Sequence, residues 1–335
     1  MERASDAGGQ EARRKEDMRR PWVLAWTILL ALILASPAWG QRVLVMPPQQ
    51  AAGSPSTNWI GTGLAVALGE ALTTGGVFTV PFEDLRSYAE QAGLVESPKF
   101  TLPAQVGLAR QIGAGTLVAG TYEATGETVS VHLQVYSVAG DLKRLASLEE
   151  SQDLSQLLAL TQKLEGALFK TLGREWTPPA QVSPRAFESY IRGRIAGDPT
   201  LQEVYFRKAV ELQPDYYDAS CYLALTLRAT GRITECTTIL GELEKKSYSK
   251  AYLGLLTLAE IRMEQGRLAD ARRLLLASLK AAESAEGHID LAQWYLKQKR
   301  TKEAMTELVV AERFGTHQED IDALRRKIQE AEGAK

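Results

Sequence analysis

Two glycine-bearing segments are the places where this chain could bind a phosphate group. Gly61-Thr62-Gly63 opens an apolar helical pattern, and Gly113-Ala114-Gly115 precedes a run that is typical of a strand. A phosphate-binding loop needs further glycines in register and, in P-loop enzymes, a lysine after them. No glycine stands at position 66, no such lysine follows, and a long polar loop separates the first motif from the preceding strand. We therefore interpret the first motif as a close helix-to-sheet contact and the second as the turn into a strand.

Residues for acid–base, nucleophilic or metal chemistry do not occur in a recognisable arrangement. The sequence has no serine elbow and no His-Glu-x-x-His segment. The adjacent Glu149 and Glu150 lie at the end of a hairpin pattern, where we expect them to be solvated. His132, His288 and His317 are scattered and lack metal-ligand spacing. We predict no catalytic residues, no cofactor and no metal site, so the protein is not expected to be an enzyme.

Three stretches near the C-terminus repeat one pattern. Leu223–Leu240, Leu258–Leu275 and Leu291–Leu308 align at offsets of 35 and 33 residues. Each unit carries one small residue in its first half and one in its second, and these are Ala224, Ala259 and Ala292, then Cys236, Ala271 and Ala304. A period near 34 is typical of stacked helical hairpins, in which small residues let two helices approach closely.

This pattern resembles the tetratricopeptide repeat. A weaker unit precedes the three, from about Ser183 to Pro214, where the proline matches the one that closes a repeat in the family. Lys299 stands where the two preceding units have a turn glycine. The resemblance implies about four repeats over residues 185–316, which form an all-α solenoid. The amphipathic segment over residues 317–335 is typical of the polar cap that such stacks need.

The resemblance also implies a groove for a partner, because the first helix of each hairpin lines the inner face of such a stack. The implied lining is mostly aliphatic and aromatic, and it lacks the set of Lys, Arg and Asn that grips a terminal carboxylate. Such a groove suits an apolar or amphipathic segment of another protein. The alternative is that these side chains pack on the neighbouring helix or on the other domain. The candidate groove residues are Phe187, Ile191, Cys221, Leu225, Arg228, Leu256, Glu260, Met263, Ile289, Gln293 and Leu296.

The two cysteines, Cys221 and Cys236, fall within one repeat and on its two helices. An exported chain could oxidise them to a disulfide. Alternatively, Cys236 is a compact apolar side chain in the helix contact, since it aligns with Ala271 and Ala304.

The N-terminus indicates export. Basic residues between positions 13 and 20 precede an uncharged apolar run from Trp22 to Gly40, which ends in a small-x-small pattern. This is typical of a signal peptide over residues 1–40, so we predict a periplasmic or otherwise exported protein. The run approaches the roughly 20 residues that span a bilayer. An uncleaved inner-membrane anchor over residues 22–39 is therefore the alternative, and only then do we expect membrane contact.

Residues 41–173 mix strand and helix patterns. Trp59–Gly76 has helical periodicity, Val129–Val135 alternates like a strand with one buried face, and Leu154–Leu172 is amphipathic. These patterns predict an α/β domain that has a mixed sheet with flanking helices. A proline-rich linker over residues 174–184 joins it to the repeats.

The order of these patterns resembles the N-terminal α/β domain of TolB-like envelope proteins, to which curli-secretion and flagellar-accessory modules are related. The segments that carry the resemblance are VLVMPP, WIGTGLAVALGEALTTGGVFTV and GAGTLVAGTYEATGETVSVHLQVYSVAGD. It implies the fold and a protein-contact role in the periplasm. Pro48 stands where the family has an aromatic residue, and no propeller domain follows.

The net charge of −2 gives no reason to expect a nucleic-acid partner. We predict a non-enzymatic exported adaptor that binds other proteins of the cell envelope through the repeat groove and the α/β domain. Two alternatives are a self-associating structural protein of the envelope and a sensor or transport accessory module that binds a small ligand.

Overall fold

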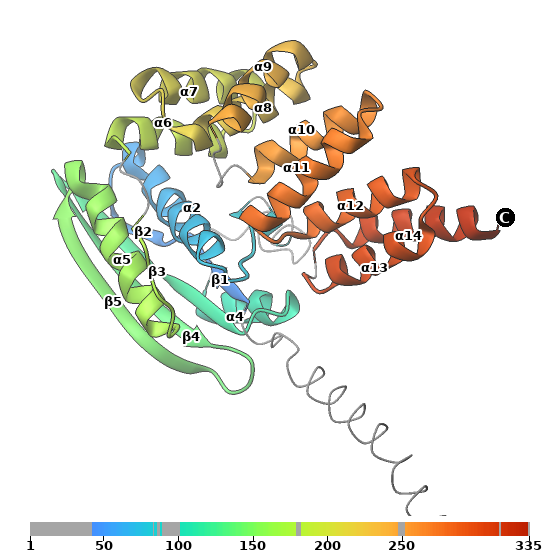
Figure 1. The fold of residues 1–335 in the computed structure, drawn as a ribbon. Coiled ribbons are helices and arrows are strands. Elements are labelled where there is room, and N and C mark those ends of the chain that lie inside the picture. Colours follow the sequence, from blue (N-terminus) through green and yellow to red (C-terminus); the bar gives the residue numbers. More distant parts are fainter. Residues whose placement is uncertain are drawn as a thin grey trace, which may run out of the picture.

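The computed structural model describes residues 42–82, 84, 85, 88, 101–178, 182–246, 252–314 and 316–333. An α/β domain with a mixed sheet is followed by a helical solenoid, which confirms the fold class expected from the sequence (Figure 1). Residues 1–40, the expected signal peptide or anchor, lie outside the described residues. Within the described ranges, no helix combines the length and the apolar character that a bilayer crossing requires.

The sheet has a parallel edge and an antiparallel meander. β1 and β2 both pair with β3 in parallel, and β3, β4 and β5 follow one another as antiparallel neighbours. The strand order is β1-β3-β4-β5, with β2 also on β3. The strands are β1 (Val43–Val45), β2 (Gln49–Gly53), β3 (Thr116–Thr125), β4 (Thr128–Ser137) and β5 (Lys143–Asp153).

Helices cover both faces of the sheet. The inward side chains of β4 pack with α2 (Trp59–Thr74) and α5 (Leu157–Thr171) in one core. Residues of β1 and β3 that point the other way pack with α4 (Leu102–Gln111) in a second core. Since successive strand side chains alternate between faces, the predicted alternation on β4 fills the first core with Val129, Val131, Leu133 and Val135.

Gly61 lies where α2 comes closest to the sheet. A Cβ atom at this position would lie 2.2 Å from the carbonyl oxygen of Pro48 and 3.0 Å from the ring of Tyr122 on β3. No side chain fits in that space, so only glycine allows this approach. This geometry confirms that Gly61-Thr62-Gly63 is a packing motif.

Antiparallel helical hairpins make up the described C-terminal half. The pairs α6/α7, α8/α9, α10/α11 and α12/α13 pack side by side, and α14 follows. Their bounds are α6 (Pro184–Ile195), α7 (Pro199–Leu212), α8 (Tyr217–Ala229), α9 (Ile233–Lys245), α10 (Tyr252–Glu264), α11 (Leu268–Ala281), α12 (Ala285–Lys297), α13 (Thr301–Glu312) and α14 (Gln318–Gly333).

The repeated sequence positions have one structural role in each hairpin. Gly231, Gly266 and Lys299 end the first helices with φ angles of 78°, 74° and 59°. Glycine adopts this left-handed conformation without a steric penalty, whereas Lys299 does so at some cost in free energy. The six aligned small residues are all fully buried at the contact between paired helices, and they are Ala224, Ala259, Ala292, Cys236, Ala271 and Ala304.

The last helix closes the stack. Ile321, Leu324 and Ile328 of α14 are buried in a cluster with side chains of α12 and α13. The remaining residues of α14 are largely charged and exposed or half-buried, as a terminal cap requires.

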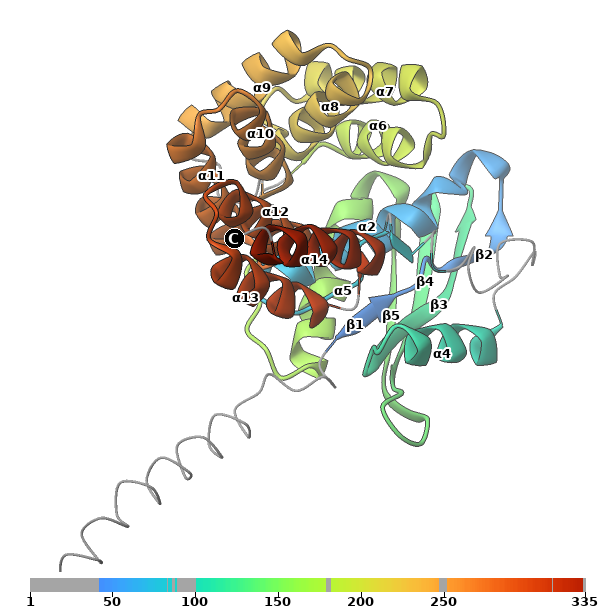
Figure 2. The same cartoon turned by 90° about the vertical axis from the view of Figure 1, so that its right-hand side faces the viewer.

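The solenoid curves over one side of the α/β domain. In both ribbon views its concave side faces α2, with α6 near one end of that helix and α12 to α14 toward the other (Figures 1 and 2). A single hydrophobic core includes residues of β4, α2, α5 and the helices from α6 to α12. The two domains therefore pack as one body.

Candidate binding cleft between the two domains

Aromatic packing joins the first solenoid helix to α2. The ring of Phe187 on α6 meets Trp59 of α2 edge to face, with centroids 6.3 Å apart. A Cβ at Gly63 would touch both Phe187 and Ile191 at 3.4–3.5 Å. Gly61 thus allows α2 to approach the sheet, and Gly63 allows it to approach the solenoid.

A buried cation crosses the same contact. The Arg194 side chain is only 4% exposed, and its Nη1 donates to Oε1 of Glu70 on α2 at 2.8 Å. The Tyr190 hydroxyl donates to the same carboxylate oxygen at 2.7 Å. The guanidinium also lies over the ring of Tyr222, 4.0 Å from its centroid, in a favourable cation–π arrangement. This network fixes α6 and α8 against α2.

A second contact joins the far end of the solenoid to the sheet domain. Nη2 of Arg42, beside β1, donates to the carbonyl oxygen of Arg313 at 3.1 Å. The rings of Phe78 and Phe314 meet edge to face with centroids 5.3 Å apart. The α/β domain is therefore held at both ends of the curved stack.

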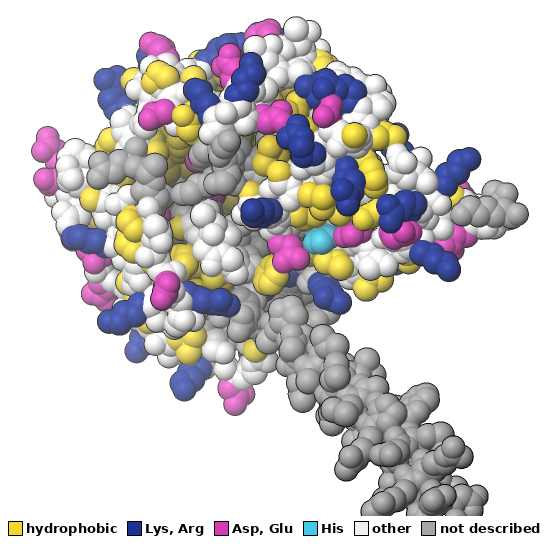
Figure 3. All heavy atoms as spheres, viewed as in Figure 1, with side chains coloured by type: hydrophobic (Ala, Val, Ile, Leu, Met, Phe, Trp, Pro, Cys, Tyr) yellow, Lys and Arg dark blue, Asp and Glu magenta, His cyan; other side chains and the backbone are white. Residues whose placement is uncertain are grey.

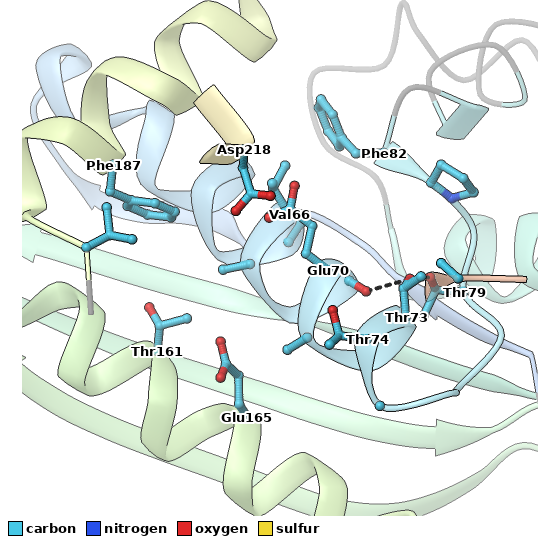
Figure 4. A pocket seen from close by; sticks show the side chains of 18 of the residues that line it. Val66, Glu70, Thr73, Thr74, Thr79, Phe82, Thr161, Glu165, Phe187 and Asp218 are labelled. Carbon is cyan, nitrogen blue, oxygen red and sulfur yellow. Dashed lines mark hydrogen bonds between the residues drawn. The ribbon is translucent and has the colours of Figure 1, made fainter. Parts of the chain in front are cut away.

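Between the two contacts lies a cavity of about 480 Å³, which we call the interdomain cleft. Thr161 and Glu165 reach into it from α5, and Asp218 comes from the solenoid on the opposite side (Figure 4). Other parts of the lining are Ala71 and Thr74 of α2, Cys221 and Tyr222 of α8, and Tyr252 and Leu253 of α10. Both domains are needed to form it.

The cleft is aromatic and acidic in character. Its lining contains one arginine, Arg194, and five carboxylates, which are Glu70, Glu165, Glu175, Asp215 and Asp218. Glu165 is 3% exposed, and one of its oxygens accepts a hydrogen bond from Trp176 Nε1 at 3.2 Å. An occupant that carries positive charge next to an apolar surface matches this lining.

The eleven candidate groove residues have different surroundings, and their role in binding stays a prediction. Phe187 and Cys221 line the interdomain cleft. Arg228 forms ion pairs with Glu260 and Glu264 of the next repeat, so it links α8 to α10. Leu225, Arg228, Glu260 and Leu296 are half-buried and Gln293 is exposed. The buried members are Phe187, Ile191, Cys221, Leu256, Met263 and Ile289.

Burial of these six matches the alternative in which they pack on neighbouring helices or on the other domain. Leu256 and Met263 belong to the common core, and Ile289 belongs to the cluster under α14. A tetratricopeptide alignment assumes an open inner face, whereas here α2 covers part of it. Residues of α2 and α5 therefore line the cleft. The repeat pattern could not predict these residues, because they lie in the other domain.

One sequence signal did point to the cleft. Glu165 lies one turn after Thr161 on the face of α5 that also carries Leu157, Leu164 and Leu168, all of them buried. A carboxylate on an otherwise apolar helix face is uncommon unless it has a partner. The sequence pattern of α5 therefore marks Glu165 as a candidate site residue.

The cysteines are free, and burial raises the pKa of both the Cys221 and the Cys236 thiol. They are therefore reduced packing residues in this structure, and a thiol with a raised pKa is a poor nucleophile at neutral pH.

The histidines are not uniformly isolated, contrary to the expectation from their spacing. Among the described residues, one group could hold a metal ion through nitrogen and oxygen atoms within 4.8 Å of one another, and it consists of Asp84, Glu286 and His317. A hydrogen bond with Glu286 raises the pKa of His317 to about 9. His288 contacts Glu307 through Nδ1 at 2.8 Å, and His132 lies on the exposed face of β4.

Comparison with known proteins gives partial similarity to solved structures. No protein-family model matches the chain, and no curated protein matches it. The C-terminal domain of LpoB from Escherichia coli is 18% identical, with a TM-score of 0.29 over 38% of this chain and 93% of that one. The lipoprotein GNA1162 from Neisseria meningitidis is 18% identical, with a TM-score of 0.31 over 39% of this chain and 97% of that one. The LpoB C-terminal domain from Salmonella enterica is 16% identical, with a TM-score of 0.27 over 37% of this chain and 90% of that one.

Proposed function

We propose that this protein is a non-enzymatic exported adaptor, and that the interdomain cleft binds a short segment of a partner protein in the cell envelope. The observation that carries the proposal is the cleft itself, a cavity of about 480 Å³ that both domains line. The signal-like N-terminal sequence supports export. We also propose that the hairpins are tetratricopeptide repeats and that the sheet domain is TolB-like, as the residues quoted above suggest.

The size of the cleft limits what can enter. A cavity of a few hundred Å³ accommodates a small molecule or a few side chains of a peptide. An extended segment with one basic and one or two apolar side chains would use the carboxylates and the aromatic rings together. Its other residues would lie along the surface of α8 and α12, where Leu225 and Leu296 are half-buried and Gln293 is exposed.

Affinity capture with matched variants tests the proposal. Leu253 lines the cleft from α10 and is half-buried, whereas Leu276 on α11 is 41% exposed and lies outside the cleft. Leu253→Glu and Leu276→Glu introduce the same charge on neighbouring helices. After cross-linking in the native envelope, we expect partner proteins to be retained by the wild type and by Leu276→Glu and lost from Leu253→Glu. Equal retention by both folded variants would contradict binding at the cleft.

A second candidate function is the binding of a small cationic ligand in the same cavity. The position of the cavity between two domains favours this function, because small-molecule sites are common at domain interfaces. A ligand that binds the folded state raises the melting temperature by mass action. Thermal unfolding in the presence of amines and basic dipeptides distinguishes the candidates, since a stabilising amine without any captured protein would favour the small-ligand function.

A further inference from the structure

Three side chains from distant parts of the sequence meet where the solenoid ends on the α/β domain. His317 Nε2 lies 3.1 Å from Glu286 Oε1 and 3.8 Å from Asp84 Oδ2. Asp84 belongs to the α/β domain, Glu286 to α12, and His317 immediately precedes α14. In the space-filling view, a histidine with acidic side chains beside it is visible at the surface in this region (Figure 3).

The distances match those between ligands of one metal ion. Two bonds of about 2.0–2.1 Å at a tetrahedral angle place the ligand atoms roughly 3.3 Å apart. The two distances from His317 Nε2, 3.1 Å and 3.8 Å, lie on either side of this value. All three candidate ligand atoms lie within 4.8 Å of one another, so rotations of the three side chains can bring them around one ion.

The surroundings of His317 suit a ligand. Its Nδ1 lies 3.5 Å from Asp320 Oδ2, on the side away from Glu286 and Asp84. A histidine that binds a metal through one nitrogen almost always directs its other nitrogen to a carboxylate or carbonyl, which orients the ring. The His317, Asp84 and Glu286 side chains are 25%, 22% and 33% exposed, so an ion and a water molecule can reach them.

A buried carboxyl group, Asp290, lies beside the group. Asp290 lies one helical turn after Glu286 on the same face of α12. It is 5% exposed, and its Oδ2 has no hydrogen-bond partner. The positive charge of Arg228 on α8 lowers the pKa of Asp290, but by less than burial and Glu286 raise it. A further cation near Glu286 would offset this concentration of carboxylates.

We propose that Asp84, Glu286 and His317 bind a divalent ion of the Zn²⁺ class, which fastens the end of the solenoid to the α/β domain. One imidazole nitrogen with two carboxylate oxygens favours Zn²⁺ over Mg²⁺ and Ca²⁺, which prefer oxygen ligands alone. A water molecule completes a four-coordinate site. The site is separate from the interdomain cleft and does not depend on partner binding.

Zinc titration by calorimetry, after removal of metals with EDTA, tests the proposal. Four proteins are compared, and they are the wild type, Asp84→Asn, His317→Asn and His132→Ala. Asparagine tolerates the φ of 56° at position 317, and Asp84→Asn is isosteric, so both variants should fold. His132→Ala is the matched control, because it removes an exposed histidine that also lies near a carboxylate, Glu149 at 3.8 Å.

The expected result is one Zn²⁺ bound per chain in the wild type and the control, with affinity at least tenfold weaker in each cluster variant. X-ray absorption of the zinc-loaded wild type should show nitrogen and oxygen ligands at about 2.0–2.1 Å. Zn²⁺ should also raise the melting temperature of the wild type more than that of His317→Asn. Absence of zinc binding, or equal affinity in all four proteins, would overturn the proposal and leave an ordinary ion pair between His317 and its carboxylates.

Discussion

Asp290→Asn should stabilise the protein increasingly from about pH 4 to pH 7, with the full effect above pH 7, and leave its stability unchanged below pH 4. Burial, and then the charge of Glu286, raise the pKa of Asp290 from 3.8 to about 7. The folded state therefore holds this proton more tightly than the unfolded state does. Between about pH 4 and pH 7 the free energy of unfolding must fall as pH rises, and above pH 7 the full penalty is present.

The magnitude follows from the size of the shift. About three pH units at 1.36 kcal/mol each correspond to a penalty on the order of 4 kcal/mol at pH 8. Because Asp290 is 5% exposed, solvent screening reduces this value little. Asparagine has the same shape as the protonated acid and does not ionise, so the variant should lack this loss.

Urea unfolding followed by circular dichroism at pH 5, 6, 7 and 8, in buffer with EDTA, measures the effect. The difference in unfolding free energy between the variant and the wild type isolates Asp290 from other titrating groups. We expect it to be about 1.5 kcal/mol at pH 5, to grow by roughly 1.3 kcal/mol per pH unit to pH 7, and to level off above pH 7. Asp141→Asn, in an exposed turn, is the control for the same change of side chain. A pH-independent difference for Asp290→Asn would contradict the raised pKa of Asp290.

Three further predictions concern packing and the contact between domains. Gly61→Ala should cost roughly 1–3 kcal/mol in urea unfolding, because its Cβ would overlap the Pro48 carbonyl. Gly69→Ala on the same helix has nothing within 4 Å and should be neutral or stabilising, so equal effects would contradict the close contact. Leu256→Glu should abolish the helical signal of the solenoid, because an unpaired buried charge costs several kcal/mol; a native spectrum would show that Leu256 is not core. Glu70→Gln should destabilise by on the order of 1–2 kcal/mol, since Arg194 is buried but Glu70 is 42% exposed; unchanged stability at low salt would argue against the ion pair.

Much of the fold was predictable because local patterns set it. Periodicity gave the helical hairpins, the alternation of Val129 to Val135 gave a half-buried strand, and paired small residues marked the helix contacts. Lys299 aligned with two glycines because all three occupy a left-handed turn. In each case the residue type is determined by the backbone conformation or by a neighbour close in sequence.

The site was less predictable because it depends on contacts between residues more than 100 positions apart. Arg194 and Glu70 pair across 124 residues, and His317 reaches Asp84 in the other domain. No sequence spacing reveals such pairs. The predicted groove lining also assumed an open inner face, and six of its eleven residues are buried here because neighbouring helices and α2 pack on that face.

Hydrogen–deuterium exchange of the protein, with and without its captured partner, tests whether the partner binds between the domains. We expect slower exchange in α10 and α5, whose side chains line the cleft, and little change in α7 and α9, which contribute no residue to its lining. Protection confined to those outer helices, or to the exposed face of β4 and β5, would contradict it.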